Sequence, residues 1–170
     1  MAVKFTDNSA KVKGALNDAV IAYLYEAGGE LEAQTKRNMP PGHWNSQIKN
    51  SWMYEVDEAK GTATIGNPLE AALWVEFGTG EYSISPKGGR KGYWVYVSDS
   101  SKPQNSYTYS GGKQYTLQEA RSIVAMMRAK GLDAHYTKGQ APKRPLFHAF
   151  NTQKGALIKR AQEVLKARFK

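Results

Sequence analysis

The chain has no cysteine among its 170 residues, and it has no long apolar run. The first absence excludes disulfides, thiolate zinc sites and cysteine nucleophiles. No window approaches the roughly 18 apolar residues that a membrane span requires. The first seven residues also lack the apolar core of a secretory signal. We therefore expect a protein that is made in a cytoplasm and has no membrane partner.

Catalytic and metal-binding motifs are missing as well. His43, His135 and His148 lie far apart without ligand spacing, so we expect turn or surface histidines. No nucleophile elbow, phosphate-binding loop or dinucleotide fingerprint occurs. Glu76 has no second carboxylate near it in sequence to divide acid and base roles. The sequence thus predicts a protein that is not an enzyme and holds no metal or cofactor.

Acidic residues are scarce in the second half of the chain, whereas the first half has a small excess of them. Residues 1–85 carry 7 Lys+Arg against 11 Asp+Glu, a balance of −4. Residues 86–170 carry 17 against 4, a balance of +13. This asymmetry is typical of a basic surface that meets a polyanion, or of complementary faces that steer assembly. The alternative is a solvated basic surface without a role.

Apolar periodicity predicts a long first helix over residues 8–37 and a last helix that begins near Asn151. Gly28 and Gly29 each weaken the first helix by roughly 1 kcal/mol relative to alanine, which favours a bend there. The apolar stripe of the first helix is made by residues at three- and four-residue spacing: Val12, Leu16, Ala19, Val20, Tyr23, Leu24, Ala27 and Leu31. This pattern is typical of a helix that packs on a core.

Shorter elements are predicted between the two helices. Alternating residues over 52–57 and a returning run over 62–65 indicate a hairpin. Asn67 is a candidate N-cap for a short helix that ends at a left-handed Gly78, although a strand over 73–77 also fits. Residues 93–97 and 133–137 have strand composition, and residues 98–112 form a polar loop. Thr116 and Glu119 form a capping box for a further helix that Gly131 ends.

These elements predict an α+β fold in a single domain over residues 1–170. A mainly antiparallel sheet is expected to pack against the long N- and C-terminal helices.

Aromatic and basic side chains are interleaved in the middle of the chain. The members that we select as candidate interface residues are Arg90, Lys91, Trp94, Tyr96, Tyr107 and Tyr109. Rings for stacking and cations for phosphates are combined on single-strand nucleic-acid surfaces. Tyrosine and arginine also dominate protein–protein interfaces, and no nucleic-acid-binding motif is present. We prefer the protein interface and keep nucleic-acid binding as the alternative.

Two blocks of the sequence carry a resemblance to a known family. One is residues 73–80, with the turn Glu76, Phe77, Gly78, Thr79 and Gly80; it follows Ile65-Gly66-Asn67-Pro68. The other is the Pro-rich, aromatic residues 138–150 before a basic helix. In this order the blocks resemble the tail-completion, or head–tail joining, family of long-tailed bacteriophages. The resemblance covers most of the chain, and residues 82–136 match it only loosely, as a family-variable, loop-rich insertion.

The resemblance implies a structural virion protein at the neck, where the tail tube joins the connector. Its partners would be tail and connector proteins, and it would form a ring of identical subunits in the virion while being a monomer or weak oligomer when free. It would be made in the host cytoplasm during assembly, and its basic half would line the DNA passage or dock an acidic connector. Arg144, Pro145 and Phe147 join the candidate interface on this reading. A stand-alone nucleic-acid-binding protein is the alternative, and a small hydrolase is a third.

Overall fold

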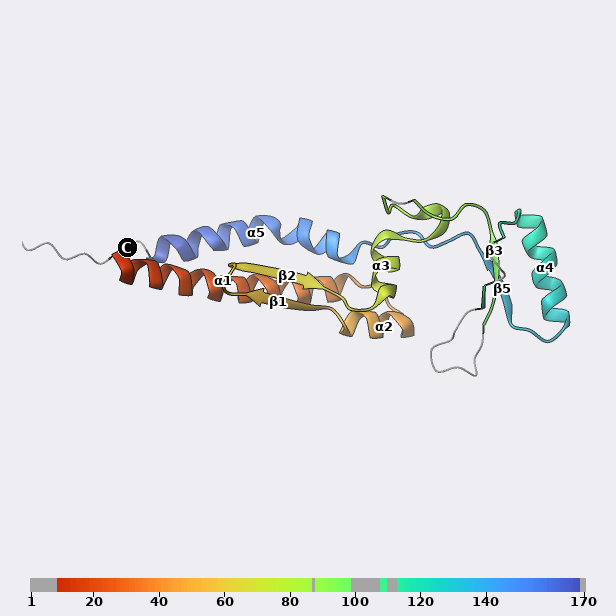
Figure 1. Ribbon diagram of the computed structural model, residues 1–170, viewed down its shortest axis with the longest axis horizontal. Helices are drawn as coiled ribbons and strands as arrows, with labels where there is room; N and C mark the ends of the chain where they lie inside the picture. Colours follow the sequence, from red (N-terminus) through yellow and green to blue (C-terminus); the bar gives the residue numbers. More distant parts are fainter. Residues whose placement is uncertain (1–8, 87, 99–107, 110–112, 169–170) are drawn as a thin grey trace, which may run out of the picture. The chain divides into compact units, whose positions relative to one another are not determined.

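The computed structural model describes residues 9–86, 88–98, 108–109 and 113–168. The chain forms two compact units. Unit 1 comprises residues 1–72 and 144–170, and unit 2 comprises residues 73–143. Long helices and antiparallel strands make up the two units (Figure 1), which confirms the predicted α+β class.

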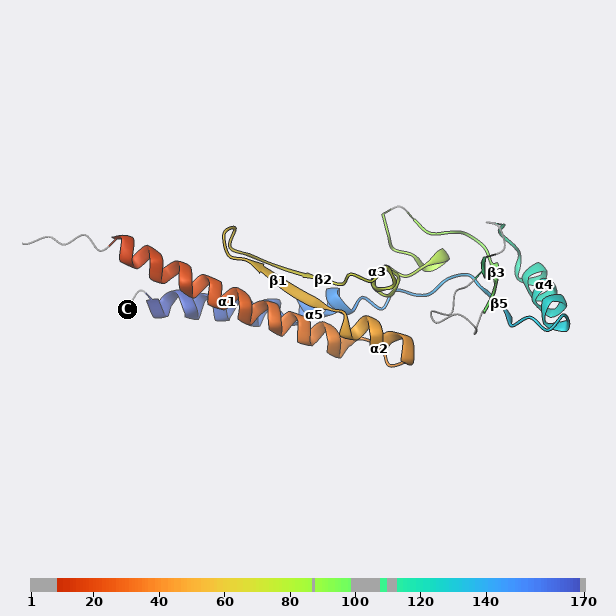
Figure 2. The same ribbon diagram turned by 60° about the horizontal axis from the view of Figure 1, so that its bottom comes forward.

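Unit 1 is built on two long antiparallel helices, α1 (Ser9–Asn38) and α5 (Pro145–Arg168). Figures 1 and 2 show the two helices side by side along most of their length. At one end the Asn38 Nδ2 group donates to the Pro145 carbonyl at 3.1 Å. Further along, the Tyr23 hydroxyl donates to the Leu157 carbonyl at 2.8 Å. The predicted helix over residues 8–37 is confirmed within one residue at each end.

A hairpin of β1 (Met53–Asp57) and β2 (Thr62–Gly66) packs on α1. The strands pair antiparallel, with Met53 opposite Gly66 and Asp57 opposite Thr62, as the alternating pattern predicts. The ring of Tyr54 lies against α1 at Gly28 and Gly29, so that a Cβ on Gly28 would lie 2.9 Å from Tyr54 Cγ. α1 runs through both glycines as one helix, and their small size permits this close contact.

One helix of unit 1 was not predicted. α2 (His43–Asn50) follows Gly42, which has a φ of 139° and caps the helix without a side-chain hydrogen bond. The sequence therefore lacks the usual Ser, Thr, Asp or Asn signal at that end. Burial of Ile48 and of the following Trp52 accounts for the helix, because both side chains enter the core of unit 1.

The element α3 (Glu70–Phe77) begins in unit 1 and ends in unit 2. The Asn67 Oδ1 accepts from the Leu69 amide at 3.0 Å, and the Asn67 Nδ2 group donates to the Ile48 carbonyl at 2.7 Å. The predicted role of Asn67 in starting this helix therefore has a structural basis. Residues 73–77 are helical, so the alternative of a strand there is wrong.

Unit 2 contains a three-stranded antiparallel sheet of order β4-β3-β5. The strands are β3 (Trp94–Val97), β4 (Thr108–Tyr109) and β5 (Ala134–Thr137). A 3-10 turn, η1 (Gly80–Tyr82), and the helix α4 (Leu117–Ala129) complete the unit. The predicted capping box of α4 is confirmed: the Thr116 Oγ1 accepts from the Glu119 amide at 3.3 Å, and the Thr116 amide donates to Glu119 Oε2 at 2.7 Å. These hydrogen bonds to Thr116 also hold the pKa of Glu119 below its usual value.

α4 covers one face of this sheet. Val95 of β3 and Ala134 of β5 are fully buried against Ala120 and Val124 of α4. Because neighbouring residues of a strand point to opposite faces, Trp94 and Tyr96 lie on the face away from α4. The core of unit 2 is therefore one-sided and leaves an aromatic face for the site described below.

The predicted start of the last helix near Asn151 is wrong, since α5 begins at Pro145. Proline suits the first position of a helix, where its missing N–H costs no hydrogen bond. Pro145 is fully buried, and the preceding Arg144 has a φ of 53°. Among the residues that the structure describes, no helix is long and apolar enough to cross a membrane.

Alanine at two glycines of α1 should have opposite effects on stability. Gly28→Ala should lower the free energy of unfolding by roughly 1–3 kcal/mol, because the new methyl group displaces the Tyr54 ring. Gly14→Ala meets nothing within 4 Å and should raise it by up to about 1 kcal/mol through helix propensity. Urea unfolding of the full chain, followed by circular dichroism, measures both. Equal stability of the two variants would contradict the packing role of Gly28.

Candidate functional site

The turn that ends α3 is shaped by two glycines with left-handed backbones. The Gly78 amide donates to the Trp74 carbonyl at 2.9 Å and closes the helix. Gly78 has a φ of 71° and Gly80 a φ of 60°, conformations that cost other residues roughly 1–2 kcal/mol. The predicted left-handed Gly78 is confirmed.

This turn pairs with a segment that lies some 60 residues further along the chain. The Thr79 amide donates to the Gln140 carbonyl at 2.9 Å, and the Gln140 amide donates back to Thr79 Oγ1 at 2.9 Å. The Glu81 amide donates to the Lys138 carbonyl at 2.9 Å. The turn of the first block therefore lies beside the first residues of the second block, 138–140, within unit 2.

Glycine permits the close approach of these backbones. A Cβ on Gly78 would lie 2.7 Å from the Gln140 carbonyl oxygen and 2.8 Å from Pro142. A Cβ on Gly80 or on Gly139 would collide with the backbone of the opposite segment. The pairing thus requires glycine on both sides, which is a reason for the Gly-Thr-Gly sequence at this turn.

Glu81 ties the turn to further parts of unit 2. Its Oε1 accepts from the Gly92 amide at 3.1 Å, and its Oε2 lies 3.6 Å from Lys138 Nζ. The hydrogen bond with Tyr82, followed by the charges around it, holds the pKa of Lys138 above its usual value.

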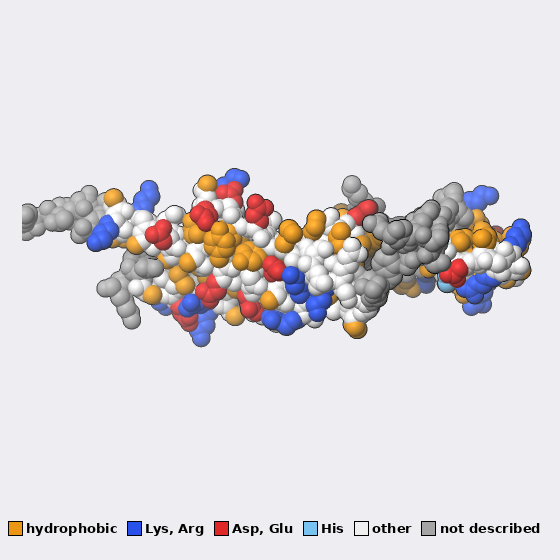
Figure 3. Space-filling model, turned by 90° about the horizontal axis from the view of Figure 1, so that it is seen from below, with side chains coloured by type: hydrophobic (Ala, Val, Ile, Leu, Met, Phe, Trp, Pro, Cys, Tyr) orange, Lys and Arg blue, Asp and Glu red, His pale blue; other side chains and the backbone are white. Residues whose placement is uncertain are grey.

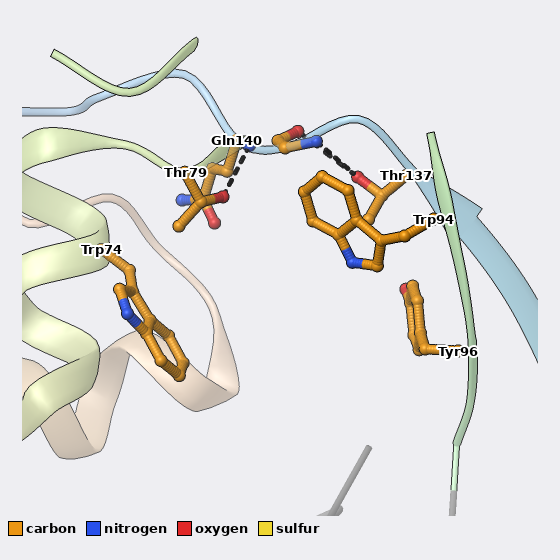
Figure 4. Close-up of a pocket in the computed structure, with 7 residues that line it drawn as sticks. Trp74, Thr79, Trp94, Tyr96, Thr137 and Gln140 are labelled. Carbon is orange, nitrogen blue, oxygen red and sulfur yellow. Dashed lines mark hydrogen bonds between the residues drawn. The ribbon is translucent and has the colours of Figure 1, made fainter. Parts of the chain in front are cut away.

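A pocket of about 380 Å³ opens beside the paired segments. Its lining comes from α3, the glycine turn, β3, β5 and the residues after β5: Trp74, Thr79, Trp94, Tyr96, Thr137, Gly139 and Gln140. All seven belong to unit 2. Figure 4 shows Trp74 on one side of the pocket, with Trp94 and Tyr96 on the other.

The three aromatic side chains of the pocket differ in exposure. Trp94 is only 8% exposed, because its ring packs against the Gly80 turn, whereas Trp74 is 47% exposed. Tyr96 is half-buried and stacks on His135 with ring centres 5.4 Å apart. Trp94 and Tyr96 are held by their neighbours and form one wall of the pocket. The Trp74 indole, on the other side, is exposed to solvent over about half of its surface.

The structure brings some of the predicted interface residues together. Trp94 and Tyr96 line the pocket, and the Arg90 guanidinium lies 5.2 Å from the centre of the Trp94 ring. Lys91, the next residue, is exposed. Tyr109 pairs with Tyr96 through the backbone of β4. Tyr107 lies outside the described residues.

The other predicted residues belong to unit 1. Pro145 is buried at the start of α5, and Phe147, two residues later, is exposed. The Arg144 guanidinium lies 3.5 Å from the centre of the Phe147 ring. The predicted interface residues therefore form two separate groups, one in each unit.

Sequence reasoning missed Trp74, Thr137 and Gln140 as members of a site. Trp74 belongs to the block of residues 73–80, but nothing in the neighbouring sequence indicates that its side chain faces β3. The missing signal is the pairing of Thr79 with Gln140, which no local pattern encodes.

The site is suited to binding. Among the described residues, no group of three or more His, Asp or Glu side chains is arranged to hold a metal ion. Six of the seven lining residues carry no ionisable side chain, and the seventh, Tyr96, carries a phenol. Aromatic walls with a few hydroxyl and amide groups are typical of ligand pockets.

Comparison with known proteins gives one family. A family model described as "Bacteriophage HK97-gp10, putative tail-component" matches residues 4–78. This match confirms, over those residues, the resemblance to phage tail proteins that the sequence motifs predict, and it supports a structural component of the phage tail. No match was found among curated proteins or among solved structures.

Two glycines of unit 2 with similar backbones should respond differently to alanine. Gly131 has a φ of 79° and nothing within 4 Å, so Gly131→Ala should cost only the left-handed strain of roughly 1–2 kcal/mol. Gly78→Ala adds a collision with the Gln140 carbonyl and Pro142 and should cost roughly 1–3 kcal/mol more. Urea unfolding gives the two free energies. Amide NMR shifts at Thr79 and Gln140 should move in Gly78→Ala only; unmoved shifts there would contradict the pairing.

Proposed function

We propose that the chain is a non-enzymatic structural protein of the phage neck, where it joins the tail tube to the connector. The observation that carries this proposal is the match of residues 4–78 to a family described as a phage tail component. The finer placement at the neck rests on the ordered motifs of residues 65–80 and 138–150, which resemble tail-completion proteins. The hydrogen bonds between Thr79 and Gln140 support it, because they join the turn of the first block to the start of the second.

The surface of unit 1 supports a role in assembly. Figure 3 shows hydrophobic side chains gathered among acidic and basic ones. Large apolar residues that are exposed on α1, β1 and α5 are Val12, Tyr25, Met53, Phe147, Phe150, Ile158 and Leu165. On α5, Phe147, Ile158 and Leu165 fall on one face by helical spacing. Exposed apolar surface on a helix is typical of protein contacts.

In the virion this surface would be covered by neighbouring subunits and by tail and connector proteins. A ring of identical subunits satisfies such contacts, because head-to-tail contacts that close leave no exposed end. The free chain is then a monomer or weak oligomer that becomes a ring on the tail. The virion contains it at the neck, and the host cytoplasm contains it during assembly.

Removal of the gene from a phage that encodes the chain should leave heads and tails that are complete but not joined. A plasmid copy should restore joined particles, and a copy with Phe147→Asp and Ile158→Asp should not, because charge is introduced on the exposed face of α5. Electron microscopy of lysates measures the fraction of joined particles. A plasmid copy with Lys159→Asp controls for charge alone. Normal particles without the gene would contradict the neck role.

Nucleic-acid binding is the second candidate, and the position of Arg90 over Trp94 favours it. The excess charge of residues 86–170 attracts DNA whatever the true partner is. For a neck protein we expect binding of fluorescent single-stranded DNA that falls steeply as salt rises, since counterion release supplies its free energy. Trp74→Ala and Trp94→Ala should leave that binding unchanged. A dedicated single-strand binder would keep affinity at high salt and lose about 1–3 kcal/mol per stacked base.

A further inference from the structure

Unit 1 carries an exposed apolar patch with acidic side chains around it. Tyr25 of α1 is 44% exposed, and its ring meets the Tyr54 ring edge-on, with centres 6.5 Å apart. The Tyr25 hydroxyl donates to Glu58 Oε1 at 2.9 Å. Asp18 and Ala22 are exposed and share a face of α1 with Tyr25, because residues three and four apart are neighbours on a helix. We call these five residues the α1 patch. Figure 3 shows hydrophobic side chains with acidic ones around them over the middle of α1.

The outer face of α5 combines apolar side chains with positive charge. Phe147, Ile158 and Leu165 are all exposed on this helix. Lys154 is exposed one turn before Ile158 and falls on the same face by helical spacing. The Arg144 guanidinium adds a second cation, because it lies over the Phe147 ring. We call these five residues the α5 patch, and its charge is opposite to that of the α1 patch.

The two patches lie on different sides of unit 1. Tyr23 faces α5, since its hydroxyl donates to a carbonyl of that helix, and Tyr25 follows two residues later. Arg160 faces α1, since it pairs with a carboxylate of that helix, and Ile158 precedes it by two residues. Residues two apart on a helix do not share a face, so Tyr25 and Ile158 both point away from the contact between α1 and α5. The two patches therefore cannot cover each other within one chain.

We propose that the α1 patch of one copy of the chain binds the α5 patch of the next copy. The apolar centres of the two patches bury each other, and the carboxylates around one meet the cations of the other. The occupant is a second copy because the chain itself supplies the complement of each patch. Since the two patches differ, the contact is heterologous, and a heterologous contact that closes forms a ring. Both patches are small, which fits a chain that associates only weakly when free.

This inference rests on the proposed function and deepens it, because it states which surfaces join neighbouring subunits of the ring. It is tested on the purified chain, whereas the neck role is tested on particles. The expected contact together with normal particles in the gene deletion would remove the neck role and keep the contact. Unjoined particles without the contact would do the reverse.

The test is a cross-link between single cysteines, which the absence of native cysteine makes specific. One full-length variant carries Ala22→Cys in the α1 patch. The other carries Gln162→Cys, an exposed residue one turn after Ile158 on the same face of α5. The two are mixed at low salt, where charges are least screened, and treated with a short bismaleimide. This reagent traps a contact even when it is short-lived. Intact mass spectrometry separates the mixed dimer from the two homodimers, and we expect the mixed dimer in excess.

The matched control for the α5 position is Ala156→Cys. Ala156 is exposed on the same helix but precedes Ile158 by two residues, so it lies outside the α5 patch. Mixed with Ala22→Cys, it should give no excess of the mixed dimer. Circular dichroism verifies that each variant keeps the fold.

Charge reversal on the Gln162→Cys copy tests the pairing of the patches. Lys154→Asp should lower the yield of mixed dimer roughly two- to fivefold, the range for an exposed charge pair. Lys159→Asp, on another side of α5, should leave the yield unchanged. Glu58→Lys in the Ala22→Cys copy should restore part of the yield that Lys154→Asp removes. Equal yields for Lys154→Asp and Lys159→Asp would contradict the pairing of charges.

Three results would overturn the proposal as a whole. An excess of Gln162→Cys homodimers would mean a symmetrical contact between two α5 helices. Equal yields with Gln162→Cys and Ala156→Cys would mean random collision. No cross-link in any mixture is the result expected if a different tail protein, and not a second copy, covers the α5 patch.

Discussion

The pairing of residues 78–81 with residues 138–140 is the contact on which the rest of unit 2 depends. Three backbone or hydroxyl hydrogen bonds of 2.9 Å join the two segments. Glycines on both sides bring them closer than any other residue would permit. The same contact packs Gly80 against the Trp94 ring, and that ring forms the wall of the pocket. The turn that looks like an ordinary reversal of the chain in the sequence is thus a long-range clamp.

Charge has a double role in this chain. Part of the excess positive charge of residues 86–170 is paired within unit 1, where Arg160 Nε of α5 lies 2.8 Å from Glu26 Oε1 of α1. Such an exposed pair contributes little to stability, because solvent and salt screen the two charges. Lys154, Lys159 and Lys166 are exposed on the same helix. Arg160 is therefore paired inside unit 1, whereas these lysines are exposed to solvent.

Local signals were read correctly from the sequence, and long-range ones were not. Thr116 and Glu119 encode a helix start within four residues, and the structure has that capping box. The predicted start of α5 is too late because the Pro-rich residues 138–150 read as a segment before the helix, although a proline at the first helical position is favourable. The sequence predicts that Gly28 weakens the first helix. Its packing against Tyr54 could not be predicted, because Tyr54 lies on a strand that only the fold brings near. The pocket was not predicted for the same reason: Trp74 and Trp94 line one pocket because of the fold, in which Thr79 pairs with Gln140.

The way the chain enters and leaves unit 2 bears on its organisation. The Lys143 amide donates to the Val75 carbonyl at 2.8 Å, so the last residue of unit 2 is bonded to the third residue of the unit. A segment closed at its base in this way can vary in length without moving the helices on either side. The family match ends at residue 78, just inside this base. The insertion predicted at about residues 82–136 stays a prediction. These hydrogen bonds give a physical reason for it, because fixed ends allow the residues between them to vary.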